Sequence, residues 1–138
     1  MNGGRELTSR QKTGNLGEEI ACQYLKNHGY EIVERNYWKK WGEIDVVARN
    51  LKDKSLHFIE VKTVTRAVGG LTADGAYGYE AEENVHPWKL KRLTRAIQTY
   101  ILERRIDEDK TPWQLDVITV SLDYDMRKAR VKLIPDVF

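Results

Sequence analysis

The chain runs Gly42-Glu43-Ile44-Asp45-Val46-Val47-Ala48 and, after a polar break, Leu56-His57-Phe58-Ile59-Glu60-Val61-Lys62. Each run is rich in β-branched and aromatic residues and is bounded by turn-forming residues, which predicts two short strands. Because strand side chains alternate between faces, Asp45 is expected to share a face with Glu43 and Val47. By the same rule, Glu60 shares a face with Lys62. Charges on apolar strands are costly to bury unless they are paired or hold a metal, so these residues need a partner or a function.

Before these strands, the sequence predicts a helix over residues 13–28 and a first strand over residues 30–38. Apolar side chains recur at helical spacing from Leu16 to Leu25, and Gly29 stands where a left-handed residue ends a helix. Residues 1–12 are polar and are expected to form a flexible N-terminal arm. Projected around the helix, Glu18 falls at the edge of the apolar stripe and Glu19 on the far side. Of the two, Glu18 is therefore the candidate for a site.

After these strands, the sequence predicts a long loop over residues 66–85, a second helix over 87–105 and two more strands over 113–122 and 129–134. Pro87 suits the first turn of that helix. Apolar residues fall on both faces of the strand at residues 55–64, which is typical of a central strand covered on both sides. The prediction is a single α/β domain over residues 13–138, with a central mixed sheet flanked by helices in the order α-β-β-β-α-β-β.

Composition narrows the function classes. The 138 residues fit one domain, with 41% hydrophobic and 32% charged residues and a net charge of +2, which permits a nucleic-acid partner without requiring one. Cys22 is the only cysteine, and the three histidines are scattered, which argues against a disulfide framework or a thiolate zinc site. No apolar run approaches the ~20 residues of a membrane span. A cytoplasmic protein without a membrane association is expected.

Carboxylate oxygens without histidine or thiolate neighbours suit the hard cations Mg²⁺ and Mn²⁺. Asp45 and Glu60 are the candidate metal ligands, Glu18 is a third candidate ligand from the helix, and Lys62 would position an attacking water. Such a set supports phosphoryl transfer, because the ion polarises the phosphoryl oxygen and a lysine stabilises developing negative charge. The alternative is a buried ion pair between Lys62 and either carboxylate, without any chemistry.

The second helix carries a concentration of positive charge. We expect Lys89, Lys91, Arg92 and Arg95 to contact nucleic-acid phosphates, although such a face is more often simply solvated. The four tryptophans are expected mainly in the core or at interfaces, while Trp41 could stack on a base. The roles of Glu43 and Asp116 stay open.

Residues along nearly the whole chain carry a family resemblance. They are Gly14-x-x-Gly17-Glu18 with Ala21 and Tyr24-Leu25, Gly29-Tyr30, Arg35-Asn36, Gly42-Glu43-Ile44-Asp45, Glu60-Val61-Lys62, Lys91 and Asp116-Val117. Gly-Glu-Ile-Asp followed by Glu-Val-Lys resembles the PD-(D/E)xK nuclease motif. The whole set resembles the YraN-like family of uncharacterised bacterial proteins. The resemblance implies a restriction-endonuclease-like fold and a divalent-metal-dependent nuclease acting on DNA. Similarity to archaeal Holliday-junction resolvases adds branched DNA as a substrate class.

Three features depart from the family pattern. Val64 stands where the family usually has arginine, with Arg66 the nearest substitute. The loop at residues 66–85 is longer than usual, and Gln114 precedes Leu115-Asp116 where Arg-Phe-Asp is common. These departures bear on substrate contacts rather than on metal ligands. Two alternatives remain: a nucleic-acid-binding scaffold without catalysis, and a protein-interaction module that uses the long loop. A homodimer is a further expectation, with that loop or an edge strand as the contact.

Overall fold

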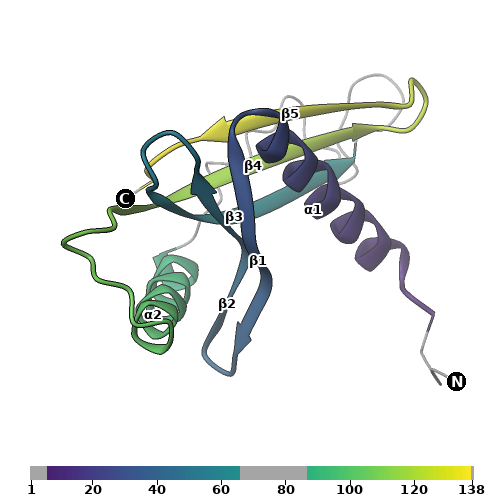
Figure 1. Cartoon of the computed structure of the whole chain (residues 1–138). Helices are drawn as coiled ribbons and strands as arrows, with labels where there is room; N and C mark the ends of the chain where they lie inside the picture. The colour runs from purple at the N-terminus through teal and green to yellow at the C-terminus, as the bar shows by residue number, and fades with distance from the viewer. Residues whose placement is uncertain (1–5, 66–86, 138) are drawn as a thin grey trace, which may run out of the picture.

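The computed structural model describes residues 6–65 and 87–137 of the chain. These form two helices and five strands in the order α1, β1, β2, β3, α2, β4, β5 (Figure 1). Their bounds are α1 Ser9–Asn27, β1 Tyr30–Lys39, β2 Gly42–Asn50, β3 Leu56–Thr65, α2 Pro87–Glu103, β4 Trp113–Asp123 and β5 Lys128–Ile134. The predicted order of elements is confirmed.

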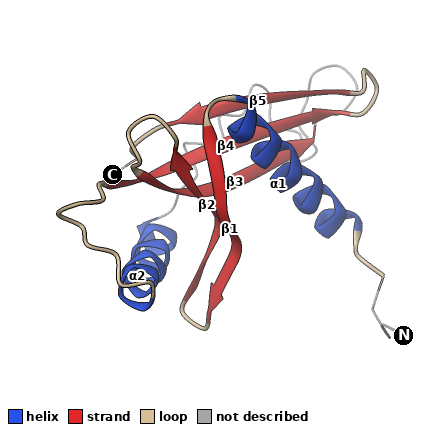
Figure 2. Cartoon of the chain, viewed as in Figure 1, coloured by secondary structure: helices blue, strands red, loops and turns tan. Residues whose placement is uncertain are grey.

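The strands form one mixed sheet in the spatial order β1-β2-β3-β4-β5. Strands β1, β2 and β3 form an antiparallel meander, β3 and β4 are parallel, and β5 returns antiparallel to β4. A parallel pair needs a crossover, and the chain between β3 and β4 includes α2. Helices α1 and α2 flank the sheet (Figure 2), so the predicted α/β class with a mixed sheet between helices is confirmed.

Two hydrophobic clusters hold the helices to the sheet. Helix α2 packs through Leu93 and Ile97 into a cluster that includes Phe58 of β3. Helix α1 packs through Ala21 and Leu25 into a cluster on the other side of β3. Strand β3 contributes to both clusters, as expected for a central strand covered on both faces. Neither helix in the described part of the chain is apolar over a length that could cross a membrane.

Helix α1 starts four residues earlier than the sequence pattern predicts. Thr8 caps it: the Thr8 hydroxyl accepts a hydrogen bond from the Gln11 N–H, and the Gln11 side chain accepts one from the Thr8 N–H. Residues 9–12 therefore belong to the helix and not to the predicted arm. The apolar stripe does not reveal this turn because its side chains face solvent. Leu16, expected on the buried stripe, is also 42% exposed.

The hairpin of β1 and β2 diverges from the rest of the sheet. Pairing between β2 and β3 runs from Arg49–Leu56 to Val46–Ile59, and beyond this point the hairpin extends away from β3 (Figure 1). Strand alternation also breaks here, because Ile44 and Val47 both join the α2 cluster while Val46 joins the α1 cluster. The expectation of simple alternation from Glu43 through Asp45 to Val47 was therefore wrong, because β2 bends where it leaves β3.

Two glycines permit close packing around this point. A Cβ at Gly17 of α1 would collide with the side chain of Thr63 on β3, and a Cβ at Gly42 of β2 would collide with the carbonyl oxygen of Arg92 on α2. Both glycines directly precede a glutamate, Glu18 and Glu43. Close approach of the helices to the strands therefore brings these two carboxylates to the region where β2 and β3 separate. The predicted loop at residues 66–85, with Arg66, lies outside the described residues.

Candidate active site

Asp45 and Glu60 meet where β2 separates from β3. Asp45 is 9% exposed and Glu60 is 4% exposed, so both carboxyl groups are buried. The Asp45 Oδ2 atom accepts a hydrogen bond from the Val61 N–H at 2.8 Å. This contact replaces the backbone pairing that β2 and β3 no longer make. The charge of the adjacent Glu60 carboxyl group acts on Asp45. The predicted juxtaposition of these two carboxylates is thus present.

The electrostatics of the pair follow from burial. Loss of solvation, and then the adjacent charge of Glu60, raise the pKa of Asp45 to about 8, although the hydrogen bond from the Val61 N–H opposes the shift. Two carboxylates in a low-dielectric site cannot both ionise without a compensating cation. Burial and the neighbouring carboxylate therefore favour the protonated form of Asp45.

Two lysines supply positive charge beside this pair. The Lys89 Nζ atom of α2 lies 2.5 Å from Glu60 Oε1. Burial alone would lower the pKa of Lys89, but the hydrogen bond and charge of Glu60 outweigh it and raise the pKa. The pKa of Lys62 is lowered, first by burial and then by the positive charge of Lys89. Sequence reasoning assigned Lys89 to phosphate binding and missed its contact with Glu60, because pairing between α2 and β3 is a tertiary feature.

Glu18 lies in the same electrostatic region but has its own partners. Burial raises its pKa, a shift that the Arg35 charge and a hydrogen bond from Asn36 oppose, while the charges of Glu43 and Glu60 add to it. The Arg35 guanidinium lies 3.9 Å from Glu18 and 2.9 Å from Glu19. Asn36 adopts φ = 54°, a left-handed conformation that asparagine tolerates. Of the two neighbouring glutamates, Glu18 is the more buried, as the helical projection predicts.

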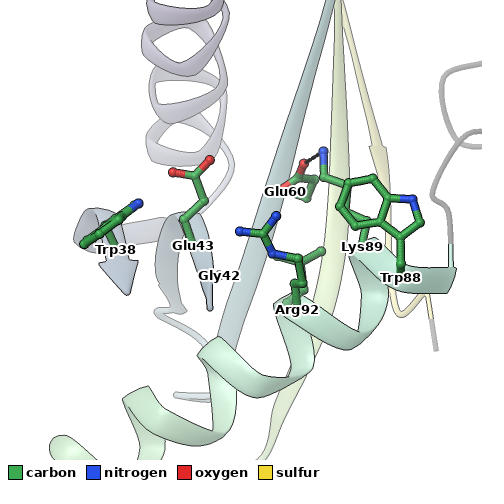
Figure 3. Close-up of a pocket in the computed structure, with 8 residues that line it drawn as sticks. Trp38, Gly42, Glu43, Glu60, Trp88, Lys89 and Arg92 are labelled. Atoms are coloured by element: carbon green, nitrogen blue, oxygen red, sulfur yellow. Dashed lines mark ion pairs between the residues drawn. The ribbon is translucent and has the colours of Figure 1, made fainter. Parts of the chain in front are cut away.

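A pocket of about 270 Å³ opens beside Glu60. Figure 3 shows Glu43 and Arg92 directed into the space between Trp38 and the Glu60–Lys89 ion pair. The lining residues are Trp38, Gly42, Glu43, Glu60, Trp88, Lys89, Arg92 and Leu93. The pocket therefore combines a buried carboxylate, two cationic side chains and two tryptophans at a single opening.

The predicted phosphate-binding residues fall into two groups. Lys89 and Arg92 line the pocket. Lys91 is exposed and does not line it, and the guanidinium of Arg95 lies 4.9 Å from the ring centroid of Trp41. The Trp41 Nε1 atom donates a hydrogen bond to Thr99, so this ring is used to pack α2 against the hairpin. Only part of the basic helix face is therefore directed toward the candidate site.

The predicted metal ligands are only partly assembled. Across residues 6–65 and 87–137, no three aspartate, glutamate, histidine or cysteine side chains form a group able to hold a metal ion. Asp45 and Glu60 act on each other electrostatically, whereas Glu18 lies 3.9 Å from the Arg35 guanidinium. The chemistry of the donors still suits a hard cation, since Lys89 and protonation of Asp45 here offset the charge that two buried carboxylates would carry.

Asp116 has a structural role. Its carboxylate accepts hydrogen bonds from His57 Nδ1 at 2.6 Å, from Gln114 Nε2 at 2.7 Å and from the Asp136 N–H at 2.9 Å. His57 Nε2 in turn contacts the hydroxyl of Ser55, which is buried and also bonded to Asp53. Asp116 does not line the pocket. Its charge is explained by a hydrogen-bond network that ties β3 and β4 to the C-terminal segment.

Trp38 and Trp88 are the pocket residues whose placement sequence reasoning missed. Tryptophans are mostly buried, which led to the expectation of core or interface positions, yet these two are 66% and 58% exposed. The neighbouring residues offered a weak signal: Trp38 and Trp88 stand beside Lys39-Lys40 and Lys89, and aromatic residues among basic ones are typical of nucleic-acid surfaces.

The fold and site together define an α/β protein with a buried carboxyl pair, two lysines and an aromatic pocket at a strand divergence. The chain matches the model of "Uncharacterised protein family UPF0102" over residues 17–120. A UPF0102 protein of Campylobacter jejuni subsp. jejuni is 38% identical over 110 residues, which cover 80% of this chain and 84% of that protein. A UPF0102 protein of Helicobacter hepaticus is 38% identical over 102 residues, covering 74% and 79%.

This chain belongs to the UPF0102 family, and the resemblance to the YraN-like family is thereby confirmed. The matched region begins at Gly17 and includes Glu18, Asp45, Glu60 and Lys62. It therefore contains the whole set of residues that the sequence analysis assigned to catalysis.

Proposed function

We propose that this protein is a divalent-metal-dependent endonuclease-like hydrolase that cuts phosphodiester bonds in DNA, with branched or structured DNA among its substrates. The observation that carries the proposal is the burial of Asp45 and Glu60 within one electrostatic environment, with Lys62 and Lys89 beside them. Burying two neighbouring carboxyl groups costs stability even where a proton and an ion pair compensate their charge. Such a cost is typical of a site that binds a cation.

In this proposal Asp45 and Glu60 hold Mg²⁺ or Mn²⁺, and Glu18 assists directly or through a water. When bound, the ion supplies Lewis-acid activation of a phosphoryl oxygen and of water. Lys62 positions the attacking water, for which its lowered pKa is suited, because an ammonium that gives up its proton readily can take part in proton transfer. Lys89 and Arg92 bind the phosphates of the strand, and Lys91 and Arg95 extend the basic surface.

Metal binding is tested by thermal unfolding with and without Mn²⁺. Wild-type protein should gain stability with Mn²⁺, because a cation that binds only the folded state raises the melting temperature. The double variant Asp45→Asn, Glu60→Gln removes both charges at nearly constant shape and should lose this gain. Glu34→Gln, which breaks an exposed ion pair with Arg104, is the matched control and should behave as wild type. Equal shifts in wild type and the double variant would exclude the site.

Catalysis is tested by cleavage of linear, flapped and four-way DNA with Mg²⁺ or Mn²⁺. Lys62→Met should reduce the rate by about 10²-fold or more, in line with the loss of one electrostatic catalytic group, while keeping the Mn²⁺ shift. Lys52→Met, on an exposed turn, is the control lysine. A Lys62 variant that cleaves as fast as Lys52→Met would remove Lys62 from the mechanism.

The second candidate is a protein that binds nucleic acid on the same scaffold without cutting it. The ion pair between Lys89 and Glu60 favours this candidate, because it neutralises a proposed metal ligand. Metal-independent DNA binding without cleavage on any substrate would support it. For either candidate we propose a cytoplasmic location, where cellular DNA is accessible. A homodimer belongs to the same proposal, with the edge strand β5 as its candidate contact.

A further inference from the structure

Two exposed tryptophans flank the pocket from different elements. Trp38 comes from the end of β1 and Trp88 from the first turn of α2. Figure 3 shows the two rings at opposite sides of the pocket, with Glu43 and Arg92 between them. Neither ring belongs to the two hydrophobic clusters that form the core. Trp38 is 66% exposed and Trp88 is 58% exposed, so each presents apolar surface to solvent beside the pocket.

The hairpin tip and the helix that carry the two rings are fastened to each other. Gly42, at the start of β2, allows the tip of the hairpin to lie directly against the backbone of α2 at Arg92. The Arg92 Nε atom donates a hydrogen bond to the Trp41 carbonyl at 3.2 Å, which fastens α2 to the same tip. The Arg92 guanidinium also lies 6.0 Å from the ring centroid of Trp88. A platform built on a helix and a hairpin keeps its geometry better than one built on loops.

The side chains that line the pocket indicate the class of ligand that it binds. Aromatic rings beside cationic side chains are the elements with which proteins bind unpaired nucleic acid: the bases stack on the rings and the phosphates meet the cations. Here Lys89 and Arg92 supply the cations beside a pocket of about 270 Å³. The bases of an intact duplex are stacked on one another, so their faces cannot reach the rings.

We infer that Trp38 and Trp88 stack unpaired nucleobases, and that the substrate of this site is a nucleic acid with unpaired nucleotides next to the bond that is cut. The inference rests on the proposed function for the nucleic-acid nature of the substrate, and it narrows that substrate to single strands, flaps and junctions. Glu60 lies in the same pocket as the rings, so a stacked base would place its strand at the carboxyl pair.

The test measures binding of fluorescent DNA by anisotropy in EDTA, where a metal-dependent enzyme does not cut. The probes are an oligothymidine strand, a strand of abasic residues of equal length and a blunt duplex. Trp38→Ala and Trp88→Ala should each weaken binding of the oligothymidine strand by about 5- to 150-fold, the range for loss of one base–aromatic stack. Binding of the abasic strand and the duplex should change little. Trp38→Phe and Trp88→Phe should restore most of the affinity, which separates stacking from folding.

Tyr124→Ala is the matched control, because this aromatic ring is 56% exposed but lies on the turn between β4 and β5, away from the pocket. It should bind all three probes as wild type does. Equal weakening of oligothymidine and abasic binding, no weakening, or a wild-type preference for the duplex would overturn the inference. Trp-dependent binding of single strands without any cleavage would keep the inference and remove the nuclease. Cleavage at the wild-type rate by both the Trp38→Ala and the Trp88→Ala variant would keep the nuclease and overturn the inference.

Discussion

At Asp45, the folded chain holds a proton that the unfolded chain releases. The ordinary pKa of 3.8 rises to about 8 on folding, first because of burial and then because of Glu60. Between these two values the folded state binds more protons than the unfolded state, so stability falls as the pH increases. The same carboxyl group is thus a cost to the fold at neutral pH and a ligand in the proposed site.

Asp45→Asn should remove this dependence. In EDTA, the variant should be more stable than wild type at about pH 9 by at least ~1 kcal/mol, and the difference should shrink steadily toward pH 4. Urea unfolding at several pH values measures it. Glu34→Gln should follow the wild-type curve, because the Glu34 pair with Arg104 is exposed. A stability difference that stays constant over this pH range would show that Asp45 is not protonated in the fold.

The residues of the site differ in how far the sequence predicts them. The proximity of Asp45 and Glu60 can be predicted, because the two residues lie on adjacent strands. Glu18 is distinguished from Glu19 by helical projection alone. The contact of Lys89 with Glu60 is not predictable, since the partner of a helix lysine depends on how the helix docks. The exposure of Trp38 and Trp88 runs against the usual burial of tryptophan, and rules of this kind fail most often at binding sites.

At the level of elements, the distance between α1 and β3 depends on Gly17. The helix lies so close to the strand that a methyl group at this position would overlap the Thr63 side chain. Gly14, three residues earlier in the same helix, has no atoms within 4 Å of an added Cβ. Helix α1 therefore has no space for a side chain at Gly17 but has space for one at Gly14.

Alanine at these two positions should have opposite effects. Gly17→Ala should destabilise the protein by about 1–3 kcal/mol through overpacking. Gly14→Ala should stabilise it by about 0.5–1 kcal/mol, because alanine loses less backbone entropy in a helix. Thermal and urea unfolding measure both. Adding Thr63→Ala to Gly17→Ala should recover part of the loss, and a Gly17 variant as stable as the Gly14 variant would contradict the close contact.

Element types and order follow from the sequence pattern, while the geometry between elements does not. Apolar periodicity identifies both helices and all five strands that the structure describes in residues 6–65 and 87–137. The first turn of α1 lacks apolar residues, and only the capping box of Thr8 and Gln11 marks its start. The bend of β2 at Asp45 arises because this strand pairs with β1 along its length and with β3 over only part of it. Such a bend depends on partners that a single run of residues does not contain.

For the whole molecule, charge limits how the proposed DNA substrate can bind. The net charge is only +2, so attraction depends on the local cations of α2 and not on the overall field. The logarithm of the binding constant should fall with the logarithm of salt concentration with a slope shallower than about −4, as expected for few phosphate contacts. Arg92→Gln should reduce this slope by about one. Glu19→Gln, on the exposed side of α1, is the control. A steep slope unchanged by Arg92→Gln would place the DNA elsewhere.

The parallel pairing of β3 with β4 also has a consequence for how the chain folds. Strands β1 to β3 and helix α1 come from adjacent segments, whereas Leu56 must find Trp113 before the sheet is complete. Contacts this distant along the chain form slowly, because a large loop must close first. During synthesis, Asp45 and Glu60 leave the ribosome before α2 and Lys89, because they come earlier in the sequence. Asp45 therefore takes up its proton late, when the second half of the molecule docks and burial raises the pKa of its carboxyl group.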